Sequence, residues 1–146
     1  MRRAGNGGFS LLEILVVLVI LGILAGVGYA SLRSMTKRQR LREAVFQVAR
    51  DLERTRGFAQ TKNNDATWTA TSSNSYTLDL NGSVLSYNLP AGVIFAPAVV
   101  GEAITYTAPY GELTAPPANK IILSYSEGAL SMEIHVVGVT GKVITP

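Results

Sequence analysis

Apolar residues are concentrated near the start of the chain. Residues 14–32 contain no charged side chain, and residues 9–12 just before them are also mainly apolar. A helix of this length spans roughly 30 Å of hydrocarbon. The pattern therefore predicts a transmembrane helix over 9–32. A helix buried in a soluble core is disfavoured, because a chain of 146 residues could hardly surround it.

The apolar pattern changes to helical spacing after residue 32. Apolar residues recur at steps of three or four until near residue 60, at Leu41, Val45, Val48, Leu52 and Ala59. Charged residues lie largely between them, at Arg42, Glu43, Arg50, Asp51, Glu53 and Arg54. We expect one helix over about 9–60, whose amphipathic second part (33–62) lays its apolar stripe on a sheet.

The rest of the chain, 63–146, has the pattern of an antiparallel β-rich head. Asn81-Gly82 between 76–80 and 83–88 is the best hairpin signal. Further strands are predicted at 67–70, 93–96, 103–107, 121–126, 130–137 and 142–145. The predicted fold class is α+β, a long N-terminal helix packed against an antiparallel β domain of two small sheets built from seven or eight strands.

Glu13 is an anomaly, because a carboxylate within an apolar run is costly in a membrane. Phe9 lies one helical turn before it, and Gly7 and Gly8 precede Phe9 after a short leader that contains Arg2 and Arg3. A cut after Gly8 would give Phe9 a new ammonium group. Glu13 could pair with that group in its own chain or in a neighbour. The alternative is that Glu13 only sits in the headgroup region at the helix start, where the macrodipole favours an anion.

Gly8, the run Phe9-Ser10-Leu11-Leu12-Glu13 and the apolar helix together resemble the class III signal of type IV prepilins and pseudopilins. The resemblance implies a leader over 1–8, a prepilin peptidase that cuts between Gly8 and Phe9 and N-methylates Phe9, and a helix that leaves the bilayer for a filament. A second resemblance, to the GspH/FimT group of minor pilins, rests on residues 89–95, 122–124, 134–136 and 141–143. Some members of that group have a C-terminal Gly-Arg-x-Arg pattern that is linked to DNA contact. In this chain Lys142 replaces the first Arg of that pattern.

Basic residues are concentrated at 33–56, and residues 57–146 are mildly acidic. Basic residues just after the span outnumber those before it, which by counting alone predicts a cytoplasmic head. The prepilin resemblance implies the opposite orientation. For the basic residues at 33–42, a solvated helix face is favoured over contact with lipid headgroups or nucleic acid. The small residues in Gly28-Tyr29-Ala30 would suit the cleavage site of a secretory signal peptide. Glu13 argues against this alternative, because it lies within the apolar region.

The chain has few groups suited to catalysis or metal binding. It lacks cysteine, which removes disulfides and thiolate sites, and His135 is the only histidine. Strand alternation places Glu133 and His135 on one polar face, without a third ligand for a metal. Gly138-Val139-Thr140-Gly141 is interpreted as a hairpin turn instead of a phosphate loop. Packing is favoured over stacking platforms for the aromatic residues Trp68, Tyr76, Tyr87, Tyr106, Tyr110 and Tyr125.

We therefore expect a structural protein and not an enzyme, with no cofactor and no metal. The expected function is that of a minor type IV pilin or a type II secretion pseudopilin, anchored in the bacterial inner membrane by a single span, with the head outside the cytoplasm. Expected partners are other pilins or pseudopilins and the prepilin peptidase. Two alternatives stay open: a minor pilin of a DNA-uptake pilus that contacts DNA, and a plain single-pass anchor for a β domain.

Overall fold

The computed structural model describes residues 10–113, 120–126, 128 and 130–145, and for residues 27, 28, 30 and 31 it describes only the backbone. The predicted leader 1–8 and Phe9 lie outside the described residues. The chain divides into two compact units, residues 1–36 and 37–146, and each is considered by itself.

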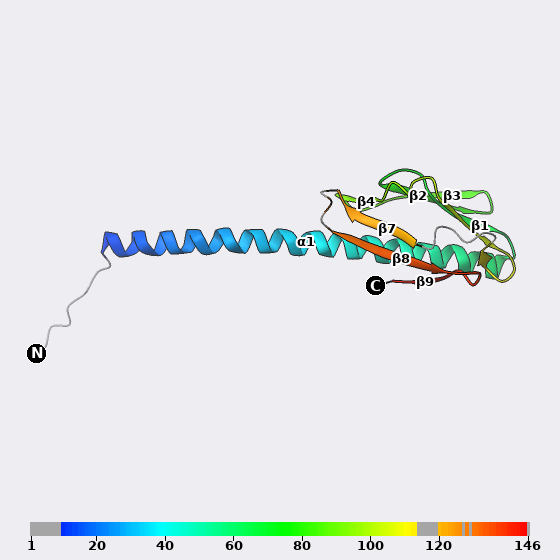
Figure 1. Ribbon diagram of the computed structural model, residues 1–146, viewed down its shortest axis with the longest axis horizontal. Coiled ribbons are helices and arrows are strands. Elements are labelled where there is room, and N and C mark those ends of the chain that lie inside the picture. The colour runs from blue at the N-terminus through cyan, green and yellow to red at the C-terminus, as the bar shows by residue number, and fades with distance from the viewer. Residues whose placement is uncertain (1–9, 114–119, 127, 129, 146) are drawn as a thin grey trace, which may run out of the picture. The chain divides into compact units, whose positions relative to one another are not determined.

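Helix α1 (Leu11–Lys62) supplies the helical part of both units (Figure 1). Lys62 places a positive charge in its last turn, where the macrodipole favours a cation. Asn63 follows with a φ of 53°, the left-handed conformation that commonly ends a helix. These bounds confirm the predicted helix over its described part. The helix ends at Lys62, two residues beyond the approximate end expected at 60 and at the bound given for its amphipathic part.

Five strands form the first sheet, in the order β3-β2-β1-β5-β6. Their bounds are β1 (Ala66–Ala70), β2 (Ser75–Leu80), β3 (Ser83–Asn88), β5 (Ala103–Thr107) and β6 (Glu112–Leu113). Every pair is antiparallel. Asn81 and Gly82 adopt φ values of 57° and 87° between β2 and β3, which confirms the predicted hairpin.

Four strands form the second sheet, in the order β4-β7-β8-β9, and all pairs are again antiparallel. Their bounds are β4 (Val93–Phe95), β7 (Lys120–Tyr125), β8 (Ser131–Val137) and β9 (Lys142–Ile144). The turn at 138–141 joins β8 to β9, as predicted. The two-sheet α+β fold is thus confirmed. Strand β6 was not predicted, because a strand of two residues has no alternation to detect.

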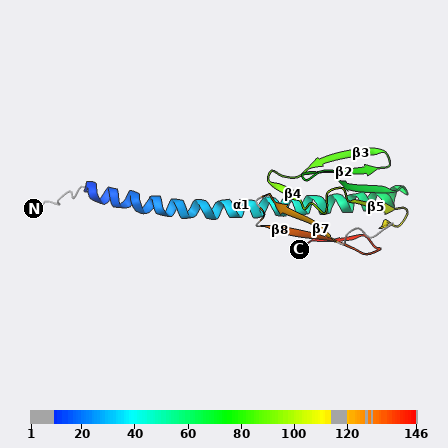
Figure 2. The same ribbon diagram turned by 45° about the horizontal axis from the view of Figure 1, so that its top comes forward.

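The core of the second unit lies between the two sheets and the part of α1 that belongs to this unit (Figure 2). The predicted helical stripe, Leu41, Val45, Val48, Leu52 and Ala59, is buried throughout. Trp68 forms the centre of an aromatic cluster, with ring centroids 5.6 Å from Tyr76 and 5.7 Å from Phe95. Because Trp68 and Tyr76 belong to the first sheet and Phe95 to the second, this cluster joins the two sheets.

Candidate functional site

The start of α1 is capped by Ser10. The backbone N–H of Glu13 donates to the Ser10 hydroxyl at 3.2 Å and to the Ser10 carbonyl at 3.1 Å. Ser10 therefore satisfies a donor that the helix itself leaves unpaired. This role was not predicted, although Ser-x-x-Glu before an apolar run is the sequence signature of a capping box.

Glu13 lies in the first turn of α1 and is exposed. Its charge is favourable there, because the N-terminal end of a helix carries a partial positive charge. Ser10 thus fixes the backbone that carries Glu13 at the helix start. Gly8 and Phe9 lie outside the described residues, so the predicted pairing of Glu13 with the Phe9 ammonium group stays a prediction.

The first turns of α1 are covered by large apolar side chains that no described residue of the first unit buries. Their exposed fractions run from 46% at Val16 to 83% at Leu11. The set comprises Leu11, Leu12, Ile14, Leu15, Val16, Val17, Leu18, Val19, Ile20, Leu21, Ile23 and Leu24. An apolar surface of this extent is typical of a region that contacts lipid or another protein.

Within the part of the chain that the structure describes, no helix combines the length and the apolar character needed to cross a membrane. The transmembrane span over 9–32 stays a prediction from the sequence.

Basic side chains follow along α1, and most of them are exposed. Arg38, Arg40, Arg42 and Arg50 are all accessible to solvent. The ammonium group of Lys37 lies 5.1 Å from the centroid of the Tyr125 ring, which is within the range of a cation–π contact. The charges of these four arginines are therefore accessible to solvent over several turns of the helix.

A polar contact joins α1 to the first sheet through a buried carboxylate. Asp51, one of the charged residues between the apolar positions of the helix, is only 7% exposed. It accepts a hydrogen bond from the Tyr76 hydroxyl at 2.5 Å, and that hydroxyl accepts one from Gln47 at 3.0 Å. Burial, together with the hydrogen bond to Asp51 and its charge, raises the pKa of Tyr76 well above its ordinary value. A buried carboxylate is tolerated here because β2 supplies its donor.

The polar face of β8 has the predicted arrangement. Glu133 contacts Lys120 at 3.0 Å and the Nε2 atom of His135 at 3.6 Å, while Ile134 and Val136 are buried on the other face. Among the described residues, no group of three or more His, Cys, Asp or Glu side chains could hold a metal ion. This cluster therefore acts as an exposed ion pair between neighbouring strands.

The aromatic residues are mostly part of the core, as predicted. Trp68, Tyr76 and Tyr106 have no exposed surface, whereas Tyr110 is 73% exposed. The buried rings cannot stack on nucleic-acid bases. Lys142, which replaces the first Arg of the basic C-terminal pattern, is the first residue of strand β9.

One family model matches the chain, the prokaryotic N-terminal methylation motif, over residues 3–29. No curated protein matches this chain. Among solved structures, the type IV minor pilin FimU of Pseudomonas aeruginosa PAO1 is similar in two crystal forms. The first has 15% identity and a TM-score of 0.60, and covers 77% of this chain and 92% of the other. The second has 13% identity and a TM-score of 0.57, with coverage of 73% and 92%. The chain therefore carries the methylation motif and has the fold of a minor pilin.

Proposed function

We propose that this chain is a minor subunit of a type IV pilus or a type II secretion pseudopilus, made as a precursor and assembled through its N-terminal helix. The observation that carries the proposal is the methylation motif at residues 3–29 on a chain with the minor-pilin fold. The motif spans the start of α1, where Ser10 caps the helix. The role is structural, because the helix and head offer surfaces for assembly.

Processing is the first step of the proposal. A prepilin peptidase cuts between Gly8 and Phe9 and methylates the new amino group of Phe9. The sequence supports this site through the short basic leader, the glycine pair before Phe9 and the apolar run after it. Before assembly, residues 9–32 anchor the chain in the inner membrane with the head outside the cytoplasm. That step rests on the charge-free run at 14–32.

Assembly is the second step. A carboxylate and an ammonium group are both costly in an apolar environment, and pairing them offsets part of that cost. Glu13 is exposed at the first turn of α1, so its carboxylate is free to meet the amino group of Phe9 on a neighbouring subunit. This contact would fix the axial register, while the exposed apolar side chains at 11–24 supply adhesion.

The mass of the intact protein purified from membranes tests the processing step. We expect a chain that begins at Phe9 with one added methyl group. A plain single-pass anchor would keep Met1, and that result would refute the proposal. Extraction of membranes at alkaline pH tests the anchor, because an integral protein stays in the pellet.

The assembly step is tested by the substitution Glu13→Gln, with Glu43→Gln as the matched control. Glu43 is an exposed carboxylate on the same helix but outside the motif. We expect the Glu13→Gln chain to stay out of sheared filaments and the control to enter them normally. Normal incorporation of both variants would refute the role of Glu13.

A further inference from the structure

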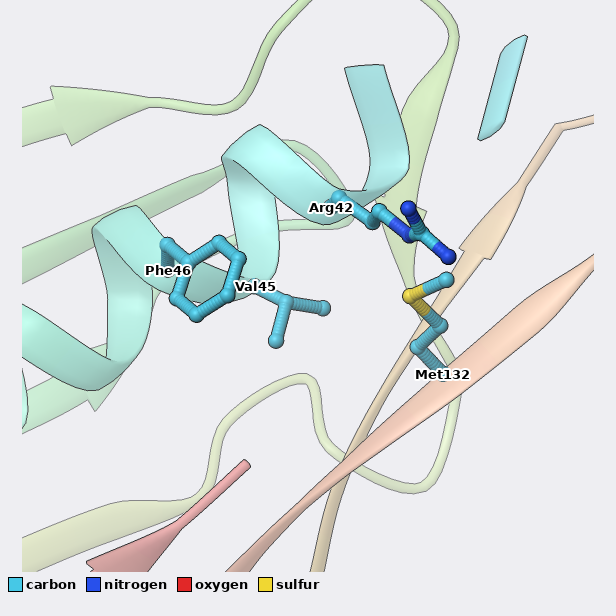
Figure 3. Close-up of a pocket in the computed structure, with 4 residues that line it drawn as sticks. All are labelled: Arg42, Val45, Phe46 and Met132. Atoms are coloured by element: carbon cyan, nitrogen blue, oxygen red, sulfur yellow. The ribbon is translucent and has the colours of Figure 1, made fainter. Parts of the chain in front are cut away.

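Phe46 is a large apolar residue that points away from the core. It is 55% exposed and separates two hollows between α1 and the second sheet. The first hollow, of about 250 Å³, is lined by Arg42, Val45, Phe46 and Met132. Figure 3 shows Met132 reaching from β8 toward the Arg42 guanidinium, with Val45 pointing into the space between helix and strand. We call the two hollows together the Phe46 trough.

The second hollow, of about 330 Å³, continues the trough toward strand β9. It is lined by Phe46, Ala49, Arg50, Glu53, Val143 and Thr145. Strand β9 is the last strand of its sheet, so its outer edge faces this hollow instead of another described strand. The backbone N–H of Val143 on this edge already donates to the Glu53 carboxylate, so side chains of the trough, and not strand pairing, would hold a bound segment.

The charges of the trough are mainly positive. Arg42 and Arg50 line one hollow each, and neither forms an ion pair with any side chain in the described part of the chain. Glu53 also lines the trough, but its carboxylate accepts the N–H of Val143 at 3.0 Å and lies 3.6 Å from Arg56. The unsatisfied charges are therefore the two guanidinium groups, which favour carboxylates in a bound partner.

The spacing along α1 defines the segment that would fit. Arg42, Phe46 and Arg50 follow each other at steps of four residues, so the two arginines lie about 12 Å apart along the helix. In an extended strand, side chains four positions apart share a face and lie about 13 Å apart. A carboxylate, an apolar side chain and a second carboxylate at alternate positions would match Arg42, Phe46 and Arg50 in turn.

We propose that the Phe46 trough binds an extended segment of a partner subunit with the pattern acidic-x-apolar-x-acidic. The partner is a different chain, because the sequence printed here has no two acidic residues four positions apart. The inference deepens the proposed function by giving the partner's chemistry, and it rests on that function for the identity of the partner as a subunit.

A labelled peptide tests the inference on the full-length protein in detergent micelles. The probe is fluorescein-labelled Ser-Glu-Val-Leu-Val-Glu-Ser, and fluorescence anisotropy measures its binding. We expect saturable binding that weakens at least about tenfold in the double variant Arg42→Gln/Arg50→Gln and in Phe46→Ala. Arg40→Gln is the matched control, since Arg40 is exposed on the same helix but lines neither hollow, and it should bind like the wild type.

Two control peptides separate charge from spacing. Glutamine in place of both glutamates should abolish most of the binding, and glutamates three positions apart should do the same because they lie on opposite strand faces. Equal affinity for any control peptide, absence of saturable binding below about 1 mM, or preference for a single-stranded oligonucleotide overturns the inference. Trp68 fluorescence verifies that each variant is folded.

The intact mass of the same preparations is measured as well, so that processing and peptide binding are tested separately. Normal processing without peptide binding refutes the trough alone. Specific peptide binding by a chain that is not processed supports the trough and refutes the proposed function.

Discussion

Removal of one hydroxyl, in Tyr76→Phe, should destabilise the head strongly. Asp51 is 7% exposed, and within the described residues the Tyr76 hydroxyl is the only side-chain group that donates to its carboxylate, at 2.5 Å. Hydrogen bonds to charged groups contribute about 1.5–3 kcal/mol, and a buried acceptor left without a donor adds a desolvation penalty. We therefore expect the free energy of unfolding to fall by about 2–3 kcal/mol.

Trp68 provides the assay, because it is the only tryptophan and is fully buried beside Tyr76. Denaturant unfolding followed by its fluorescence gives the free energy of unfolding. Tyr87→Phe is the matched control, since this ring stacks on Tyr76 at 5.5 Å and its hydroxyl accepts an exposed hydrogen bond from Arg54. The control should lose less than about 1 kcal/mol.

A double-mutant cycle isolates the contact itself. Replacing both partners, in Asp51→Leu/Tyr76→Phe, leaves no buried carboxylate without a donor, so the double variant should be more stable than the single Tyr76→Phe variant. The reasoning is refuted if Tyr76→Phe costs no more than Tyr87→Phe, or if the two substitutions at the Asp51–Tyr76 contact are additive.

Two further predictions concern the head. Burial, and to a lesser degree the charge of Glu53, raises the pKa of Tyr106, and the pKa of Tyr76 is raised as well. The contribution of these two neutral hydroxyls to stability is therefore complete below about pH 10. Above pH 10 the free energy of unfolding falls by about 1.4 kcal/mol per pH unit for each tyrosine. Urea titrations at several pH values should show a shallower fall in the Tyr106→Phe variant than in the wild type. Gly92→Ala should destabilise the head more than Gly101→Ala. Both glycines have a positive φ, but a Cβ atom at Gly92 would also meet the Tyr125 hydroxyl at 2.5 Å, whereas a Cβ atom at Gly101 would meet nothing within 4 Å. Equal midpoints of thermal unfolding for the two variants would contradict this steric argument.

Local signals in the sequence were sufficient for most of the fold. The stripe from Leu41 to Ala59 predicted the buried helix face, and Asn81-Gly82 predicted the hairpin because few other residue pairs adopt positive φ twice in succession. Ser10 also carries a local signal, the Ser-x-x-Glu pattern of a capping box, which is sufficient to predict its role at the start of α1.

Other features depend on residues that are distant in the sequence. Asp51 flanks the apolar stripe of α1, and the hydroxyl of Tyr76, on strand β2, makes its burial tolerable. Phe46 is exposed because it follows Val45 by one position, which rotates it about 100° away from the buried face. That rotation can be predicted from the spacing, but the trough beside it depends on Met132 and Val143 from the second sheet, which no local pattern reveals.

The positions of the core residues lead to a final prediction about the independence of the head. Every buried core residue that the structure describes lies between Leu41 and Val136, and the polar contacts of Asp51 and Glu53 are also made within the second unit. A chain without residues 1–36 therefore keeps all of these interactions. It loses the preceding turns of α1, whose apolar side chains at 11–24 the first unit leaves exposed.

We expect this truncated chain to be soluble and to unfold cooperatively, with a midpoint within about 5 °C of the full-length protein in detergent. The fluorescence of Trp68 reports the transition in both chains. A truncated chain that unfolds without a cooperative transition would contradict the argument, because it would mean that the head needs the first unit to complete its core. A folded head would instead show that the apolar first turns of α1 are free to serve assembly without any cost to the core.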